Sequence, residues 1–339
     1  MWAAMKNRSA RLVWSFIKFF VAFNISASFA TDLSEALRWW EPPQAFLCAA
    51  TPGEFPSKFS SSDPSHCDDG DMTLFNGLLC QAGDQRGCDA VRLAQGADGR
   101  WWRSPRRIGW TNDSHPGADV SFSPDQALGV MLYIAKARDL TAFDRWVQWL
   151  DANRPCLTKI GDQCLVKGWV RFCTDDADKR CTARPGDCAF LEATGKFVGS
   201  SKAGLCSDIL RQLHLPSDWL PSVSEQVLGS ASVNTTGFPL HLAAVQLLLA
   251  RTLGLKNDPK LDSAGEMLIM KQSQNPFFQY LADGVTPQTT ALLLQLCPSA
   301  ARPSKGRNQW SWERDQDEKA WLDSMYWDCI FLGKQLAPQ

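Results

Sequence analysis

Apolar residues recur every three to four positions through most of the chain after residue 70, and this period predicts helices with little room for strands. Short connections such as Arg138-Asp139-Leu140-Thr141 separate consecutive helices, with Thr141 as the expected cap of the second, which predicts antiparallel helical hairpins. We therefore expect an all-α chain of successive hairpins. The predicted helices are residues 73–80, 124–138, 142–153, 207–213, 239–253, 263–271, 276–281, 287–296 and 313–333.

Successive helical hairpins pack as bundles, as solenoids or as closed double-layered toroids. The sequence contains no fixed repeat length that would require a solenoid, so we expect a single (α/α) toroid-like domain over residues 31–339. Residues 154–206 contain six cysteines and many Asp, Lys, Gly and Thr residues, without a helical period. We interpret this segment as a disulfide-rich loop insertion on one face of the domain, with a second small domain as the alternative.

Residues 1–30 have the features of a secretory signal peptide. Basic residues precede an apolar run, and Ser28-Phe29-Ala30 matches the small-x-small pattern of cleavage sites. The alternative is a retained membrane anchor, for which the apolar run is rather short. No other segment is apolar enough to span a bilayer. We therefore expect a periplasmic or secreted protein that starts near Thr31 and has no stable membrane span after cleavage.

All twelve cysteines follow the expected cleavage site, and an even number of cysteines in an exported chain predicts disulfides. Cys80 with Cys88 and Cys297 with Cys329 are plausible pairs, although spacing alone leaves the connectivity open. A zinc site would need close ligand pairs such as C-x-x-C, and the sequence has none. We therefore expect neither a metal nor another cofactor.

Several classes of protein are disfavoured by the sequence. The formal net charge of -1 gives no electrostatic reason to expect binding to nucleic acid. The motifs G-x-S-x-G, H-E-x-x-H, the P-loop and G-x-G-x-x-G are absent, and the four histidines have no ligand spacing. The residues available for chemistry are therefore carboxylates, arginines and tryptophans.

Two acidic segments run directly into predicted helices. Asp69 and Asp71 precede the helix at 73–80, and Asp125 lies in the first turn of the next long helix, after the capping residue Ser123. Acids at two helix starts suggest one shared site, with Asp71 and Asp125 as its catalytic pair. The alternative is a favourable interaction with the helix dipoles, worth about 0.3 to 1 kcal/mol per charge.

Tryptophan and arginine gather in two segments that suit a sugar-binding cleft. An indole face offers a flat apolar platform to a pyranose, and guanidinium groups hold hydroxyls or carboxylates through forked hydrogen bonds. The alternatives are a tryptophan-rich turn pinned to the core and, near the C-terminus, an ordinary core helix. The candidate substrate-binding residues are Asp69, Trp101, Trp102, Arg103, Arg106, His115, Trp310, Trp312 and Glu313.

Asp69-Gly70-Asp71-Met72 and the apolar helix that follows resemble the Asp-Gly-Asp-Leu/Met turn and helix of family 8 glycoside hydrolases, in the six-hairpin glycosidase superfamily. The segment from Ser123 to Gly129 is similar to S-x-[DE]-x-x-x-G-like helix openings of such enzymes. The resemblance implies an (α/α)6 toroid, with Asp71 as a substrate-ring or base aspartate and Asp125 as its partner acid. The Ser-Glu-Gly context of the family's acid glutamate does not precede Asp69, which implies a relocated or absent acid.

We therefore expect an exported enzyme that acts on a polysaccharide or cell-envelope glycan, as a glycoside hydrolase with paired carboxylates. One alternative is a polysaccharide lyase, in which Arg103, Arg106 or Arg107 neutralises a uronate carboxylate and His115 takes the C5 proton. The others are a non-catalytic envelope glycan-binding protein and a secreted effector that acts on peptidoglycan.

Overall fold

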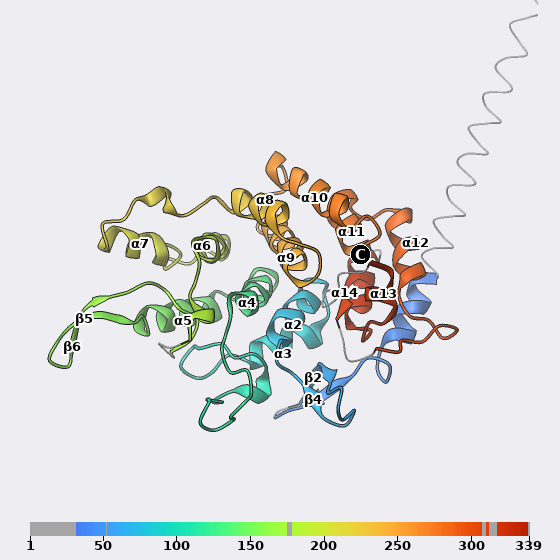
Figure 1. Ribbon diagram of the computed structural model, residues 1–339, viewed down its shortest axis with the longest axis horizontal. Helices are drawn as coiled ribbons and strands as arrows, with labels where there is room; N and C mark the ends of the chain where they lie inside the picture. The colour runs from blue at the N-terminus through green and yellow to red at the C-terminus, as the bar shows by residue number, and fades with distance from the viewer. Residues whose placement is uncertain (1–31, 52, 175–177, 307–309, 312–316, 338–339) are drawn as a thin grey trace, which may run out of the picture.

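The computed structural model describes residues 32–51, 53–174, 178–306, 310–311 and 317–337 (Figure 1). The predicted signal peptide, residues 1–30, lies outside this part of the chain. The described chain is mainly helical, so the predicted all-α class is confirmed. After a helix over residues 32–40 come α2 (Met72–Gln81), α3 (Gln85–Leu93), α4 (Pro124–Ala137), α5 (Leu140–Ala152), α6 (Pro185–Val198), α7 (Leu205–Gln212), α8 (Val223–Val233), α9 (Phe238–Thr252), α10 (Pro259–Lys271), α11 (Pro276–Asp283), α12 (Pro287–Leu296), α13 (Asp317–Leu322) and α14 (Trp327–Leu336).

The described strands form three small antiparallel pairs outside the helical body. Their lengths are only two to five residues, so they add local hairpins rather than a layer of sheet. The pairs are β1 (Leu47–Ala49) with β2 (Glu54–Pro56), β3 (Lys58–Phe59) with β4 (Cys67–Asp68), and β5 (Cys156–Ile160) with β6 (Gln163–Lys167).

Six helices form a closed circuit of contacts. The contacts run from α2 to α4, from α4 to α9, then through α11, α12 and α14 back to α2. The helices α5, α6 and α7 and the β5–β6 hairpin extend from the α4 side of this circuit, at the left of Figure 1. The circuit corresponds to the toroid-like domain expected from the sequence, and the extension contains most of the cysteine-rich segment.

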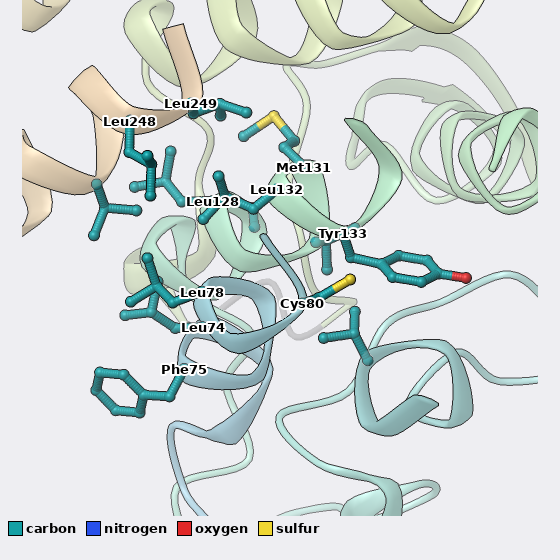
Figure 2. Close-up of a cluster of buried hydrophobic side chains, with 14 of the residues drawn as sticks. Leu74, Phe75, Leu78, Cys80, Leu128, Met131, Leu132, Tyr133, Leu248 and Leu249 are labelled. Carbon is teal, nitrogen blue, oxygen red and sulfur yellow. The ribbon is translucent and has the colours of Figure 1, made fainter. Parts of the chain in front are cut away.

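The helices α2 and α4 pack backbone against backbone. A Cβ atom added to Gly77 would lie 2.3 Å from the carbonyl oxygen of Gly129, and one added to Gly129 would lie 2.2 Å from the carbonyl oxygen of Thr73. Apolar side chains surround this crossing: Figure 2 shows Leu74 of α2 and Leu128 of α4 in one buried cluster with leucines of α9. The glycines therefore set how closely the two helices approach.

Six disulfides use all twelve cysteines. Each cysteine is paired with the cysteine next to it in the sequence. The predicted pairs Cys80–Cys88 and Cys297–Cys329 are confirmed. The other pairs are Cys48–Cys67, Cys156–Cys164, Cys173–Cys181 and Cys188–Cys206. Such a number of disulfides is typical of proteins from an oxidising compartment.

The cysteine-rich segment 154–206 contains a helix, α6, that the sequence analysis did not predict. Almost every side chain of α6 up to Gly195 is buried, including Glu192 and Thr194, so the helix has no polar face that would produce an amphipathic period. Local signals for the helix were present, because Pro185 occupies its first turn and Gly199 ends it with φ of 80°. The prediction of a loop therefore holds for only part of the segment. The analysis also left out α3 and α8.

The single helix predicted at 313–333 is wrong, because α13 and α14 are separate helices. Tyr326 breaks the helix with φ of 77°. Its ring is buried against Trp39, with 5.5 Å between ring centres, and the neighbouring Trp327 donates its indole N–H to the carbonyl of Phe46 at 2.8 Å. These tertiary contacts override the helical period of the sequence. A smaller correction concerns α5, which is capped by Asp139 rather than by Thr141.

None of the helices in the described part of the chain combines the length and the hydrophobicity needed to cross a bilayer.

His241 of α9 gives a pH prediction, because it is fully buried beside Phe277 and Phe278. Burial lowers its pKa well below the usual 6.5. The neutral ring therefore makes its full contribution to the unfolding free energy above about pH 6.5, the pKa of the unfolded chain. That contribution is lost as the pH falls towards the lowered pKa of the folded protein. Between pH 7.5 and 5.0 we expect this residue to cost up to about 2 kcal/mol of unfolding free energy. Urea unfolding of wild type and His241→Gln should differ in pH dependence by that amount; parallel pH curves would contradict it.

Candidate active site

The two acids predicted as a catalytic pair lie next to each other in the structure. Asp71 is the residue before α2, and Asp125 lies in the first turn of α4. The Gln126 side-chain nitrogen donates to Asp71 Oδ1 at 3.2 Å and to Asp125 Oδ2 at 3.3 Å. The two carboxylate oxygens are therefore separated by no more than the sum of these distances, about 6.5 Å. One buried amide thus links both acids.

The crossing of α2 and α4 brings the two helix starts together. The Gln126 Oε1 atom accepts the backbone N–H of Leu74 at 3.2 Å. A side chain in the first turn of α4 therefore supplies a hydrogen-bond acceptor to the first turn of α2. The N–H of Thr73 is bonded to the carbonyl of Arg103 at 2.8 Å. The Asp71 side chain makes no capping bond to α2. Asp71 occupies the N-cap position of α2, but its carboxylate is bonded to Arg103 and Gln126 rather than to the backbone of the helix.

Arg103 holds this region together rather than facing a ligand. Its guanidinium bonds Asp71 Oδ1 and the carbonyl of Gly70 through one terminal nitrogen, both at 2.7 Å. The other terminal nitrogen contacts Asp119 at 2.8 Å and Ser123 Oγ at 3.3 Å, and Nε donates to the carbonyl of Ser121. All five N–H donors of the buried side chain have acceptors. The predicted substrate-binding role of Arg103 is therefore corrected to a positioning role.

Asp69 is also a structural residue. It is 1% exposed, accepts a hydrogen bond from Ser104 Oγ at 2.5 Å and forms an ion pair with Arg107 at 3.1 Å. Arg107 in turn donates to the carbonyl of Asp119 at 2.8 Å. These bonds fix the loop before α2 and leave Asp69 inaccessible. The prediction that Asp69 contacts substrate is contradicted by its burial.

Two of the predicted substrate-binding tryptophans belong to the core. Trp101 is 1% exposed and packs edge-on against Tyr133, and Trp310 is 1% exposed and stacks on Phe75 with 3.6 Å between ring centres. For both indoles the interpretation as core residues is correct and the sugar-platform prediction is wrong. Trp312 and Glu313 lie outside the described residues.

Three predicted residues remain partly accessible near the acid pair. The indole of Trp102 is half-buried and carries the guanidinium of Arg100 on its face, at 3.9 Å from the ring centre. His115 is half-buried and stacks on Trp110, with 3.8 Å between the rings. Arg106 is half-buried, with a terminal nitrogen 3.4 Å from Cys48 Sγ. Trp102 and His115 thus present aromatic surface, whereas Arg106 lies against the Cys48–Cys67 disulfide.

A third carboxyl group, Asp187, was missed by the sequence analysis. It lies in the first turn of α6, which packs on α4, and it accepts the backbone N–H of Arg184 at 2.8 Å. Burial raises the pKa of Asp187, Arg184 opposes this effect, and the charge of Asp125 adds to the rise. The position of Asp187 after Arg184-Pro185 was a helix-start signal. Its proximity to Asp125 depends on tertiary packing and could not be read from the sequence.

The fold and this site define an all-α, disulfide-bonded protein with an acidic cluster at the start of two crossed helices. Among the described residues, no group of three or more His, Cys, Asp or Glu side chains is arranged to hold a metal ion. No protein-family model matches the chain, and no curated protein or solved structure is significantly similar to it.

Proposed function

We propose that this protein is an exported glycan-active enzyme, and that it hydrolyses a glycosidic bond with Asp71 and Asp125. The observation that carries the proposal is the shared hydrogen bonding of both carboxylates to Gln126. Retaining glycosidases separate their two carboxyl groups by about 5 to 5.5 Å and inverting ones by about 6.5 to 9.5 Å. Gln126 limits the distance between the two bonded carboxylate oxygens to about 6.5 Å. This limit allows the separation found in retaining enzymes and just reaches the shortest separation found in inverting ones.

The surroundings of the two acids support different roles for them. Asp71 is paired with Arg103 at 2.7 Å, and this cation favours the ionised carboxylate that a nucleophile or base requires. Asp125 has no ion pair within the described chain and lies near the negative charge of Asp187. We therefore assign Asp125 as the proton donor to the leaving oxygen. In a retaining reaction Asp71 would attack the anomeric carbon, and water activated by Asp125 would then release the sugar.

The lyase alternative receives less support from the arginines. A lyase needs a cation that is free to neutralise the uronate carboxylate. The N–H groups of Arg103 all contact acceptors within the protein. Arg107 forms an ion pair with Asp69 and donates a hydrogen bond to the carbonyl of Asp119. The lyase alternative therefore depends on Arg106, which has one described side-chain contact, to Cys48 Sγ, or on Arg100 in the pocket described below. The two product measurements distinguish a lyase from a hydrolase.

The test is a screen of the mature, oxidised protein against neutral and acidic polysaccharides and peptidoglycan. Reducing ends and the ultraviolet absorbance of unsaturated products are measured together. We expect reducing ends without absorbance, and a decrease of about 10²- to 10⁴-fold in Asp71→Asn and in Asp125→Asn, because each variant removes one acid-base group. Asp89→Asn is the matched control, since Asp89 is a half-buried acid on α3 whose described partners are Arg92 and Gln85 of the same helix.

Three outcomes would redirect the proposal. Unchanged turnover in Asp71→Asn, with retained circular dichroism and thermal stability, would remove Asp71 from the mechanism. Absorbance together with new reducing ends would identify a lyase. Binding to one glycan without turnover of any would identify a non-catalytic envelope glycan-binding protein.

A further inference from the structure

A pocket of about 260 Å³ is lined in part by the segment that anchors Arg103. Ser121 lines the pocket, and its backbone carbonyl accepts the Nε–H of Arg103, which in turn holds Asp71. The pocket and the proposed catalytic acids therefore share one supporting segment. The described lining residues are Arg100, Trp110, Thr111, Asn112, Asp113, Val120, Ser121, Cys173, Thr174 and Asp178.

Arg100 supplies a positive charge to this pocket that the described chain does not neutralise. Its guanidinium lies between two indoles, 3.9 Å from the ring centre of Trp102 and 5.6 Å from that of Trp149. The structure shows no ion pair to Arg100 within the described residues, and its buried Nε has no hydrogen-bond acceptor there. Arg100 is half-buried, and its Nε is buried without an acceptor, so an anion that reached the guanidinium from the pocket would supply the missing partner.

The pKa of Arg100 agrees with this arrangement. Burial lowers it, and the only opposing influence is the charge of Asp98. The acid groups of the pocket leave Arg100 unpaired. Asp178 is bound to Arg180, with contacts of 3.0 and 3.1 Å, and its pKa is lowered to about 2, first by that interaction. Asp113 lies on the exposed rim.

The remaining lining suits a sugar ring. Trp110 is half-buried, His115 stacks against it at 3.8 Å with an angle of 7° between the rings, and the guanidinium of Arg107 lies over the ring at 5.0 Å from its centre. The part of the indole that these contacts leave uncovered lines the pocket, and aromatic surface of this kind packs against the C–H surface of a pyranose. Hydroxyl and amide groups of Thr111 and Asn112 are available for hydroxyl recognition.

We propose that this pocket is a subsite for an acidic sugar, in which Arg100 binds the anionic group of a uronate or a sulfate ester and Trp110 supports the ring. This inference rests on the proposed function and narrows its substrate class to acidic glycans. Arg100 is offered as a specificity residue, because its planar guanidinium matches a carboxylate or sulfate bidentately. Asp71 and Asp125 keep the chemical roles assigned above.

The test measures equilibrium binding in the Asp71→Asn protein, so that ligand is not consumed. Tetragalacturonate is compared with neutral galactotetraose, and sulfated with unsulfated dextran fragments, by isothermal titration calorimetry. We expect one of the acidic ligands to bind at least 10-fold more tightly than its neutral counterpart; the pair that discriminates identifies carboxylate or sulfate. Adding Arg100→Gln should remove that preference, and Arg100→Lys should restore only part of it. Arg92→Gln, on the exposed surface of α3, is the control and should bind like its parent.

Each result decides the proposal independently of catalysis. Equal affinity for acidic and neutral ligands, or no binding to any acidic ligand, would overturn it. If Arg100→Gln also lowers thermal stability, Trp110→Ala provides a second test and should weaken binding of both members of the discriminating pair. Turnover that survives Asp71→Asn would refute the catalytic assignment of Asp71, and the comparison of acidic with neutral ligands would then be made in an Asp71→Asn/Asp125→Asn protein that shows no turnover.

Discussion

Replacing Gly129 by alanine is expected to lower the free energy of unfolding by about 3 kcal/mol or more, the upper end of the usual cost of overpacking a core. The added methyl group would lie 2.2 Å from the Thr73 carbonyl oxygen and 2.5 Å from the Leu74 Cα atom. Both atoms belong to the backbone of α2, so no side-chain rotation relieves the clash. The helices must separate, and the bonds of Gln126 to Leu74 and Asp71 must lengthen. Activity should therefore fall together with stability.

Gly229 offers a matched control for this substitution. It lies within α8, and no atom would be within 4 Å of an added Cβ, so Gly229→Ala should stabilise the protein by about 0.5 to 1 kcal/mol. Guanidinium unfolding of the oxidised proteins measures both changes. Equal stabilities for Gly129→Ala and wild type would show that the two helices do not approach as closely as described.

Replacing Arg103 by methionine is expected to reduce the unfolding free energy by about 3 to 5 kcal/mol, the usual range for breaking a buried ion pair from one side. The substitution removes four hydrogen bonds and the ion pair with Asp119 at once, and it leaves the carbonyls of Gly70 and Ser121 without their donor. The carboxylate of Asp71 also loses its cation. Arg103→Lys should recover little of this loss, because one ammonium group cannot span the same set of acceptors.

The neighbouring Arg106 is the comparison for Arg103. It is half-buried and makes a single described side-chain contact, to Cys48 Sγ, so Arg106→Met should change stability by less than about 1 kcal/mol. Chemical unfolding and glycan binding are measured for both variants. A stable Arg103→Met protein that has lost binding to acidic glycans would restore the substrate-binding role that the structure assigns elsewhere.

The amphipathic helices and the acid pair were the parts that the sequence predicted well. A helix such as α5 shows its period because one side, with Arg145 and Gln148, faces solvent. Asp71 and Asp125 were found because acids at helix starts have a recognisable pattern. The pattern suggested that the two starts share one site, but it could not show how closely the two helices cross. That depends on Gly77 and Gly129, whose roles appear only when α2 and α4 are packed together.

The segment that contains Trp101, Trp102 and Arg103 was recognised from its composition, but the arrangement of its side chains could not be predicted. Sequence could not separate Trp101, which is core, from its neighbour Trp102, which carries Arg100 on its face. It also could not show that Arg103 would find acceptors in two separate segments while the Nε of Arg100 would find none among the described residues. Whether an arginine is structural or available is decided by partners that are distant in the chain.

The order of the disulfides has a consequence for biogenesis. The cysteines are bonded two by two in their order along the sequence. In a chain that enters an oxidising compartment from its N-terminus, the correct partner of each unpaired cysteine therefore arrives before any other free cysteine. Random pairing of twelve thiols would need extensive reshuffling, whereas pairing in order of emergence needs only an oxidant. We expect formation of these disulfides to depend on a thiol oxidase and to be insensitive to loss of a disulfide isomerase.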